Sequence, residues 1–245
     1  SSWGLPANFV AQYKRKGVEK LYSWQCDCLR RPGVLGGKNL VYCAPTSGGK
    51  TLVAEILMIR RMLAEPTQKA LFVLPFVSMV SEKSAHFEFI CDNRVAMHGN
   101  ESGHRRLRVK CFTSKEDGER DFGKAQIGVC TIEKANIIVN RMMEQNELSQ
   151  IGCVVLDEMH MLGDEYRGYM LELLATKLHA ARLSSERALA ASPSAAAAPV
   201  VAAGGTAASA AEAQASGGRG TGGPAGNVAR RMRHPQIIGL SATLP

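Results

Sequence analysis

The sequence predicts an α/β fold of three layers, in which a mainly parallel sheet lies between helices on both faces. Apolar runs of strand length alternate with segments whose apolar residues have helical spacing, as at 69–75 and 52–63. The runs are apolar throughout, which is typical of strands that helices cover on both faces. Since ligands of such sheets bind at the carboxyl ends of the strands, we expect the functional residues there.

The first part of the chain is expected to contain two short helices, a strand and a longer helix. Residues 1–20 form an N-terminal segment with a helix near 8–13, and 21–29 form a second helix. A strand follows at 39–43, and the next helix ends at Pro66, because proline interrupts a helix.

The remaining strands and helices alternate along the chain. Residues 100–124 interrupt this pattern: they are polar, carry charges of both signs and are expected to form an exposed loop. We expect further strands at 69–75, 94–99, 127–131, 152–160 and 236–245, and further helices at 76–83, 133–146 and 168–183.

Composition changes abruptly after residue 183. Residues 184–229 consist almost wholly of Ala, Gly, Ser, Pro and Thr and are poor in large apolar residues, so they are not expected to pack. We therefore divide the chain into an N-terminal segment (1–20), a lobe (21–183), a low-complexity insertion that we expect to be disordered (184–234) and the last strand of the lobe (235–245).

The net charge of +8 favours a polyanionic partner such as a nucleic acid. Basic clusters occur at 14–16, 105–110 and 230–233, although each of them taken alone is better explained as a solvated face. No run of about twenty apolar residues is present, so no membrane-spanning helix is expected. Residues 1–8 lack the charged and apolar regions of a secretory signal.

The seven cysteines are predicted to be free thiols in a reducing compartment. Seven is an odd number, and no two of them form a Cys-x-x-Cys pair. Cys43, Cys130 and Cys153 lie in apolar runs of strand length, so we expect these three to be buried. Zinc ligation or disulfide bonding is the less favoured alternative.

A phosphate-binding loop is predicted at 44–51, Ala-Pro-Thr-Ser-Gly-Gly-Lys-Thr. It follows the strand at 39–43 and precedes a helix, and it fits the pattern of a small residue, four spacers and Gly-Lys-Ser/Thr, with Ala44 in the first place. The alternative is an ordinary strand, turn and helix with a chance match.

The residue types of this loop suit the binding of ATP. Gly48 and Gly49 allow a tight turn that brings backbone N–H groups against phosphate oxygens, and the helix N-terminus adds partial positive charge. Lys50 is expected to reach the β- and γ-phosphates, and the Thr51 hydroxyl to bind Mg²⁺. The rest of the predicted phosphate site is formed by Thr46 and Ser47.

Two acids follow the apolar run Cys-Val-Val-Leu. Asp157 is the candidate metal ligand, directly or through water, because Mg²⁺ prefers oxygen ligands and keeps several waters. Glu158 is then placed to orient or deprotonate the attacking water. The alternative is a pair of surface acids at a strand end.

Three strand-end motifs together resemble motifs I, II and III of superfamily-two helicases of the Asp-Glu-x-His type. They are the phosphate-binding loop, Asp-Glu-Met-His at 157–160 and Ser-Ala-Thr at 241–243. The resemblance implies a RecA-like first motor lobe. It covers about 1–90, 125–183 and 235–245, and stretches such as 21–25, 37–42, 74–78, 130–136 and 160–174 are similar to the polymerase-theta branch of this family.

The resemblance also implies roles for residues that the motifs match. Gln25 would read adenine, and its amide can both donate and accept. His160 would take part in catalysis and, with Ser241, Ala242 and Thr243, couple the state of the nucleotide to movement.

Two further segments would contact the backbone of a nucleic acid, as motifs Ia and Ib do in this family. Backbone contact suits a motor, because movement must not depend on base sequence. The residues are Pro75, Phe76 and Val77 in the first segment and Thr131, Glu133 and Lys134 in the second.

The family resemblance implies a motor lobe that hydrolyses ATP with Mg²⁺ and moves along single-stranded DNA, in DNA repair and in the nucleus. A second lobe supplies arginines to the γ-phosphate in such helicases. We expect it to be absent from this chain, so that ATP binds weakly and is hydrolysed very slowly. Two alternatives remain: an RNA helicase lobe, and a truncated module that binds nucleic acid without catalysis. No membrane partner is expected, and the oligomeric state is left open.

Overall fold

Within the described residues, six strands form one sheet in the order β1-β6-β5-β2-β4-β3, and every neighbouring pair is parallel. The computed structural model describes residues 3–45, 48–92, 107–113, 119–190 and 235–242. The parallel sheet expected from the apolar runs is confirmed. The strands are β1 (Leu40–Cys43), β2 (Lys69–Leu74), β3 (Val109–Phe112), β4 (Ile127–Thr131), β5 (Ile151–Leu156) and β6 (Gln236–Ser241).

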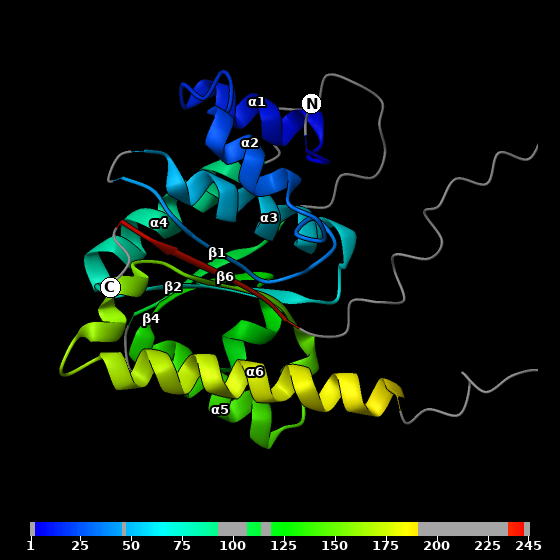
Figure 1. Cartoon of the computed structure of the whole chain (residues 1–245), viewed down its shortest axis with the longest axis vertical. Coiled ribbons are helices and arrows are strands. Elements are labelled where there is room, and N and C mark those ends of the chain that lie inside the picture. The colour runs from blue at the N-terminus through cyan, green and yellow to red at the C-terminus, as the bar shows by residue number, and fades with distance from the viewer. Residues whose placement is uncertain (1–2, 46–47, 93–106, 114–118, 191–234, 243–245) are drawn as a thin grey trace, which may run out of the picture.

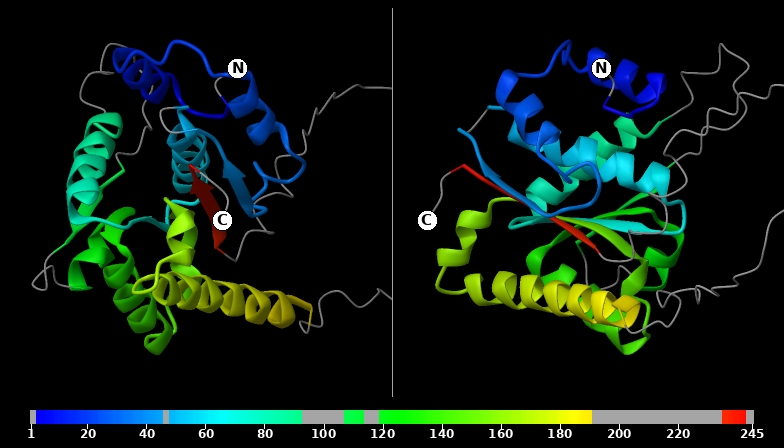
Figure 2. Two further views of the ribbon diagram at one scale, coloured as in Figure 1. Left: turned by 60° about the vertical axis from the view of Figure 1, so that its left-hand side comes forward. Right: turned by 45° about the vertical axis from the view of Figure 1, so that its right-hand side comes forward.

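Helices cover both faces of this sheet (Figure 1). One face is covered by α3 (Lys50–Ala64) and α4 (Val77–Ile90), with α1 (Ala7–Arg15) and α2 (Ser23–Arg30) packed beyond them. The right-hand view of Figure 2 shows α5 (Ile132–Glu144) and α6 (Gly168–Ala190) on the opposite face. Short 3₁₀ turns complete the chain: η2 (Glu119–Lys124), η3 (Leu148–Gln150) and η4 (Met159–Gly163).

The two faces of the sheet hold two separate apolar clusters. In β2, Phe72 points into the cluster under α3 and α4, and its neighbour Leu71 points into the cluster under α5 and α6. Successive side chains of a strand alternate between faces, so a strand buried on both sides must be apolar at every position. Burial is complete along β5, which explains its continuous apolar run.

The prediction of an exposed loop at 100–124 is wrong for part of that range. β3 pairs with β4 at the sheet edge, and Phe112 is fully buried against Phe122, with ring centroids 5.7 Å apart. The strand escapes detection because Lys110 is polar and the run has only four residues, which an edge position tolerates. The strand predicted at 94–99 lies outside the described residues.

Two further expectations need correction. Cys43 is exposed, because β1 is an edge strand whose residues alternate between buried and exposed; Cys130 and Cys153 are buried, as expected. Helix α6 continues to Ala190, beyond the predicted end at 183, and residues 191–234 of the predicted insertion lie outside the described part. All seven cysteines are free, as predicted. None of the described helices is long and apolar enough to cross a membrane.

Candidate functional site

Lys50 and Glu158 meet at the carboxyl edge of the sheet. The Lys50 amino group lies 3.7 Å from Oε1 of Glu158. Lys50 begins α3 directly after Gly49, whose φ of 74° lies in the left-handed region that glycine adopts without strain. The lysine of the phosphate-binding loop and the acid that follows β5 are therefore brought together, as the sequence analysis expected.

Asp157 is the most buried acid of the site, with 7% exposure. Its backbone N–H donates to the carbonyl of Val73 at 3.0 Å, which extends the pairing of β5 with β2. Burial raises the pKa of the Asp157 carboxyl to about 6; the N–H of Glu158, 2.8 Å from Oδ1, lowers it, and the Glu158 charge raises it. A nearby divalent cation would favour the charged form.

Glu158 has a backbone conformation that is uncommon for a residue with a side chain. Its φ is 56° and its ψ 49°, in the left-handed region. Its Oε2 atom is buried without a hydrogen-bond partner among the described atoms; Nδ1 of His160 lies 3.3 Å away, close enough for a charge interaction but not aligned as a hydrogen bond. Strain and an unsatisfied carboxylate oxygen both favour a role in binding or catalysis over a purely structural one.

The residues around Asp157 fit a magnesium ion. Asp157 and Oε2 of Glu158, which accepts no hydrogen bond from the described residues, are hard oxygen donors of the kind that Mg²⁺ prefers, and Thr51 beside Lys50 adds a hydroxyl. In the described part of the chain, no group of three or more His, Cys, Asp or Glu side chains is placed to hold a metal. Protein sites usually supply Mg²⁺ with one or two carboxylates, and the substrate phosphates supply the rest.

Gln25, the predicted reader of adenine, bonds to the phosphate-binding loop itself. Its Nε2 donates to the carbonyl of Gly49 at 2.7 Å, and its Oε1 accepts from the N–H of Tyr22 at 2.9 Å. These two bonds use half of what an amide can form, since it has two donor hydrogens and two lone pairs. The side chain is only 1% exposed, so the amide supports the loop in this conformation, and its contact with adenine remains a prediction.

His160 lies between the acids and the last strand. Oγ of Ser241, at the end of β6, is 3.4 Å from Nδ1 of His160, which also faces Glu158. The predicted coupling residues His160 and Ser241 are thus adjacent, and Ala242 follows directly. Of the other predicted residues, Thr46, Ser47 and Thr243 lie outside the described part.

The residues predicted to contact nucleic acid differ in how exposed they are to solvent. At the start of α4, Phe76 and Val77 are 49% and 53% exposed, whereas Pro75 before them is buried. At the start of α5, Thr131 is buried, and its hydroxyl accepts the N–H of Lys134 at 3.4 Å as the cap of the helix. The remaining two predicted contacts, Glu133 and Lys134, are half-buried.

The structure adds two polar residues that the sequence analysis did not identify. The hydroxyl of Tyr42 in β1 donates to the carbonyl of Lys50 at 2.6 Å and so fixes the first turn of α3. Glu55, one turn further along α3, is buried and bonded to Tyr13 of α1 and to His86 of α4. Tyr42 and Glu55 are polar residues within apolar stretches of their elements. Because a buried polar group needs a partner, this pattern in the sequence indicates that each of them forms a buried hydrogen bond.

Glu55 joins three helices. One of its oxygens accepts from the Tyr13 hydroxyl at 2.9 Å and lies 3.0 Å from Nε2 of His86, and the other lies 3.2 Å from the Lys83 amino group. Burial alone would raise the pKa of this carboxyl, but the bond from His86 and the charge of Lys83 outweigh it and hold the pKa below its ordinary value.

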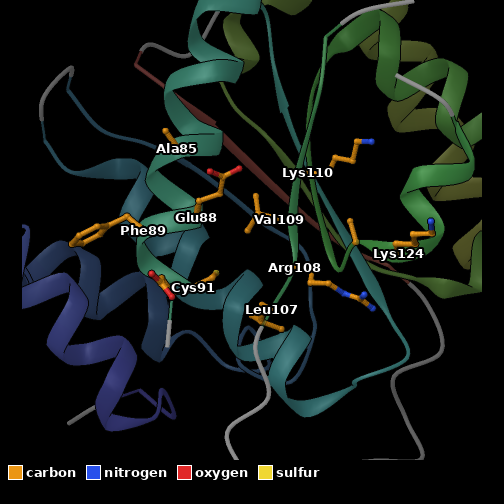
Figure 3. Close-up of a pocket in the computed structure, with 11 residues that line it drawn as sticks. Ala85, Glu88, Phe89, Cys91, Leu107, Arg108, Val109, Lys110 and Lys124 are labelled. Atoms are coloured by element: carbon orange, nitrogen blue, oxygen red, sulfur yellow. The ribbon is translucent and has the colours of Figure 1, made fainter. Parts of the chain in front are cut away.

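A cavity of about 680 Å³ lies away from this site (Figure 3). It is lined by Glu88 and Phe89 of α4, by Arg108 and Lys110 at the beginning of β3, and by Lys124 of η2. These segments lie at the amino ends of the strands, on the edge opposite to Asp157, and none of the predicted site residues lines the cavity.

Comparison with known proteins gives one family and several relatives. A sequence model described as DEAD/DEAH box helicase matches residues 29–202. DNA polymerase theta of Mus musculus is 47% identical over 73% of this chain, Helicase POLQ-like of Homo sapiens 36% over 72%, and ATP-dependent DNA helicase Hel308 of Thermococcus kodakarensis 34% over 67%. The chain spans only 6%, 15% and 13% of the length of these relatives.

Solved structures share the fold. The helicase MrfA matches 98% of this chain with a TM-score of 0.61 and 15% identity, over 30% of its own length. MrfA bound to DNA and AMPPNP matches equally well, with a TM-score of 0.61 and 14% identity over 26% of its length. At this identity the likeness shows the fold alone, and it is that of a helicase lobe.

Proposed function

The chain belongs to the DEAD/DEAH box helicase family, and on that premise we propose that it is the ATP-binding motor lobe of a DNA helicase, which couples ATP hydrolysis to movement along single-stranded DNA in DNA repair. The observation that carries this proposal is the convergence of Lys50, Asp157 and Glu158 at one edge of the sheet. A phosphate-binding loop alone would support only nucleotide binding, whereas the acids beside it supply the groups that hydrolysis needs.

In this proposal the lobe holds ATP by its phosphates. The N-terminus of α3 and the buried Lys50 attract negative charge, and the ion pair of Lys50 with Glu158 is exchanged for one with the phosphates. Asp157 and Thr51 would hold Mg²⁺, which neutralises charge on the phosphates when bound. Glu158 then orients the attacking water and accepts its proton.

Movement is proposed to follow from the neighbours of Glu158. His160 faces both Glu158 and Ser241, so a change at the γ-phosphate can reach the end of β6 through a short series of contacts. The exposed Phe76 and Val77 lie at the same edge of the sheet as the acids, because all strands are parallel. We propose that a strand of nucleic acid binds across this edge, where the N-termini of α4 and α5 favour phosphates.

The proposed site has one wall in the described residues. A second lobe is proposed to supply the opposite wall, with arginines that face the γ-phosphate. DNA as the substrate is supported by the names of the relatives, which include a DNA polymerase and an ATP-dependent DNA helicase. The location in the nucleus is proposed on the same basis, and microscopy of the tagged protein tests it.

The experiment that tests this function is phosphate release by the longest natural form of the protein, with single-stranded DNA, single-stranded RNA or neither. The proposal expects stimulation by DNA and loss of the activity in Lys50→Ala. Stronger stimulation by RNA would favour an RNA helicase. Activities that survive Lys50→Ala unchanged would favour a module that binds nucleic acid without catalysis.

A further inference from the structure

We propose that Arg167, which precedes α6, is a positioning residue for nucleic-acid binding and holds the two predicted backbone-contacting segments in register; this inference rests on the proposed function. Its Nη1 donates to the carbonyl of Pro75 at 2.8 Å, and its Nε lies 3.4 Å from Oε1 of Glu133. Its guanidinium also lies 5.3 Å from the centre of the Phe76 ring. One side chain therefore contacts the segment before α4 and the first turn of α5.

The backbone around Arg167 is fixed on both sides. Oδ1 of Asp164 accepts the N–H of Tyr166 at 2.9 Å and that of Arg167 at 2.8 Å. Gly168 follows, and a side chain there would collide with the carbonyl of Leu162. The turn from Asp164 to Gly168 thus aims the arginine at the two segments, and its planar fork can donate in two directions at once.

The contact with Arg167 explains why an acid, Glu133, lies on a surface that is proposed to bind a polyanion. Glu133 alone would repel phosphate, but in this structure it is an anchor for the guanidinium. The side chains of Arg167 and Glu133 are 37% and 40% exposed, and ion pairs of that exposure contribute little to stability. We therefore assign the contact a role in positioning rather than in stability: it sets the position of Phe76 relative to the first turn of α5.

The test is binding of a fluorescein-labelled oligo(dT) to the 245-residue chain at low salt, followed by fluorescence anisotropy. Arg167→Ala is expected to weaken binding at least about tenfold, because misplacement of binding groups by an ångström is costly. Arg187→Ala is the matched control: it removes the same charge from near the other end of α6, about 30 Å further along. It should change affinity less than about twofold, since only a distant charge is lost.

Further readouts separate positioning from a direct phosphate contact and from a structural role. Glu133→Ala should weaken binding although it removes a negative charge, and the double variant should be no weaker than Arg167→Ala alone. Arg167→Lys keeps the charge but loses the fork, and it should remain at least about threefold weaker than the unmodified chain. Thermal midpoints and binding of a magnesium–ATP analogue should stay unchanged in all of these variants.

The inference is overturned if Glu133→Ala tightens binding, if Arg167→Lys restores it fully, or if Arg167→Ala matches Arg187→Ala. A fall of the thermal midpoint by more than about 5 °C in Arg167→Ala would show a structural role instead. If the unmodified chain binds no oligonucleotide, the nucleic-acid part of the proposed function fails and the inference fails with it.

Discussion

The amino group of Lys50 lies 3.7 Å from a carboxylate oxygen of Glu158, so the cation of the phosphate-binding loop and the acid after β5 form an ion pair across the site. Lys50 is buried and Glu158 is half-buried, which strengthens their attraction relative to a surface pair. In the proposed function, a phosphate of ATP would compete with Glu158 for the lysine, and the carboxylate would then be released to act on water.

Glu158→Gln should separate binding from hydrolysis. The amide keeps the size of the side chain but can neither accept a proton from water nor repel the γ-phosphate. We expect an ATP analogue to bind at least as tightly as to the unmodified chain, while single-turnover phosphate release by the longest natural form of the protein falls about 100-fold or more. Glu172→Gln on the exposed face of α6 is the control, and equal rates in the two variants would exclude Glu158 from the chemistry.

Asp157→Asn should make the lobe more stable at neutral pH. Burial raises the pKa of Asp157 from 3.8 to about 6, so between these two pH values the folded state holds a proton that the unfolded state has lost. The stability from this protonated acid is complete below the unfolded pKa and disappears as the pH rises through the folded pKa. The asparagine variant avoids that loss and should gain about 1–3 kcal/mol at pH 7, the equivalent of up to two pKa units.

Urea unfolding between about pH 3 and pH 8 measures this difference. The gain of Asp157→Asn should shrink toward zero only below the unfolded pKa of 3.8, where the acid is protonated in both states. Binding of a magnesium–nucleotide complex should be weaker in the variant throughout. If Asp157→Asn were less stable than the unmodified chain at pH 7, the account of Asp157 as a buried acid that is costly to ionise would be wrong.

Glu55→Gln should destabilise the lobe. The variant leaves Lys83 and His86 without their buried counter-charge, and removal of one partner from such a pair costs about 3–5 kcal/mol. Because the folded pKa of Glu55 is lowered, its contribution is complete above the unfolded pKa, near 4.5, and is lost as the pH falls through the folded value.

Chemical unfolding at pH 7 and at a pH below the folded pKa of Glu55 tests the role of this acid. Tyr13→Phe is the matched control, since it removes only the hydroxyl bond to Glu55 and should cost about 1 kcal/mol. Equal losses in the two variants would mean that the charge of Glu55 contributes nothing beyond a single hydrogen bond.

Local patterns in the sequence suffice to predict the sheet and the centre of the site. The strands β2, β4 and β5 are buried on both faces and therefore read as continuous apolar runs. The phosphate-binding loop and the acids Asp157 and Glu158 lie at strand ends, and parallel strands bring such ends to one edge.

The features that sequence reasoning missed depend on long-range contacts or on marginal composition. Arg167 acts through Pro75 and Glu133, which are distant in the chain, and Glu55 through Tyr13 and His86. β3 is a short edge strand that carries a lysine, so its pattern is close to that of a loop. The end of α6 at Ala190 cannot be told from the sequence, because its alanines resemble those of the low-complexity segment that follows, although alanine favours a helix.

The most direct test of the central claim is calorimetric titration of a non-hydrolysable magnesium–ATP analogue into the 245-residue chain and its Lys50→Ala variant. We predict one bound nucleotide per chain and a loss of affinity of at least about tenfold in Lys50→Ala, since the lysine is the buried cation that meets the phosphates. Lys124→Ala, the same change at the opposite edge of the sheet, should bind like the unmodified chain. Binding that is absent from the unmodified chain, or equal in Lys50→Ala, would contradict the assignment of this edge as the nucleotide site.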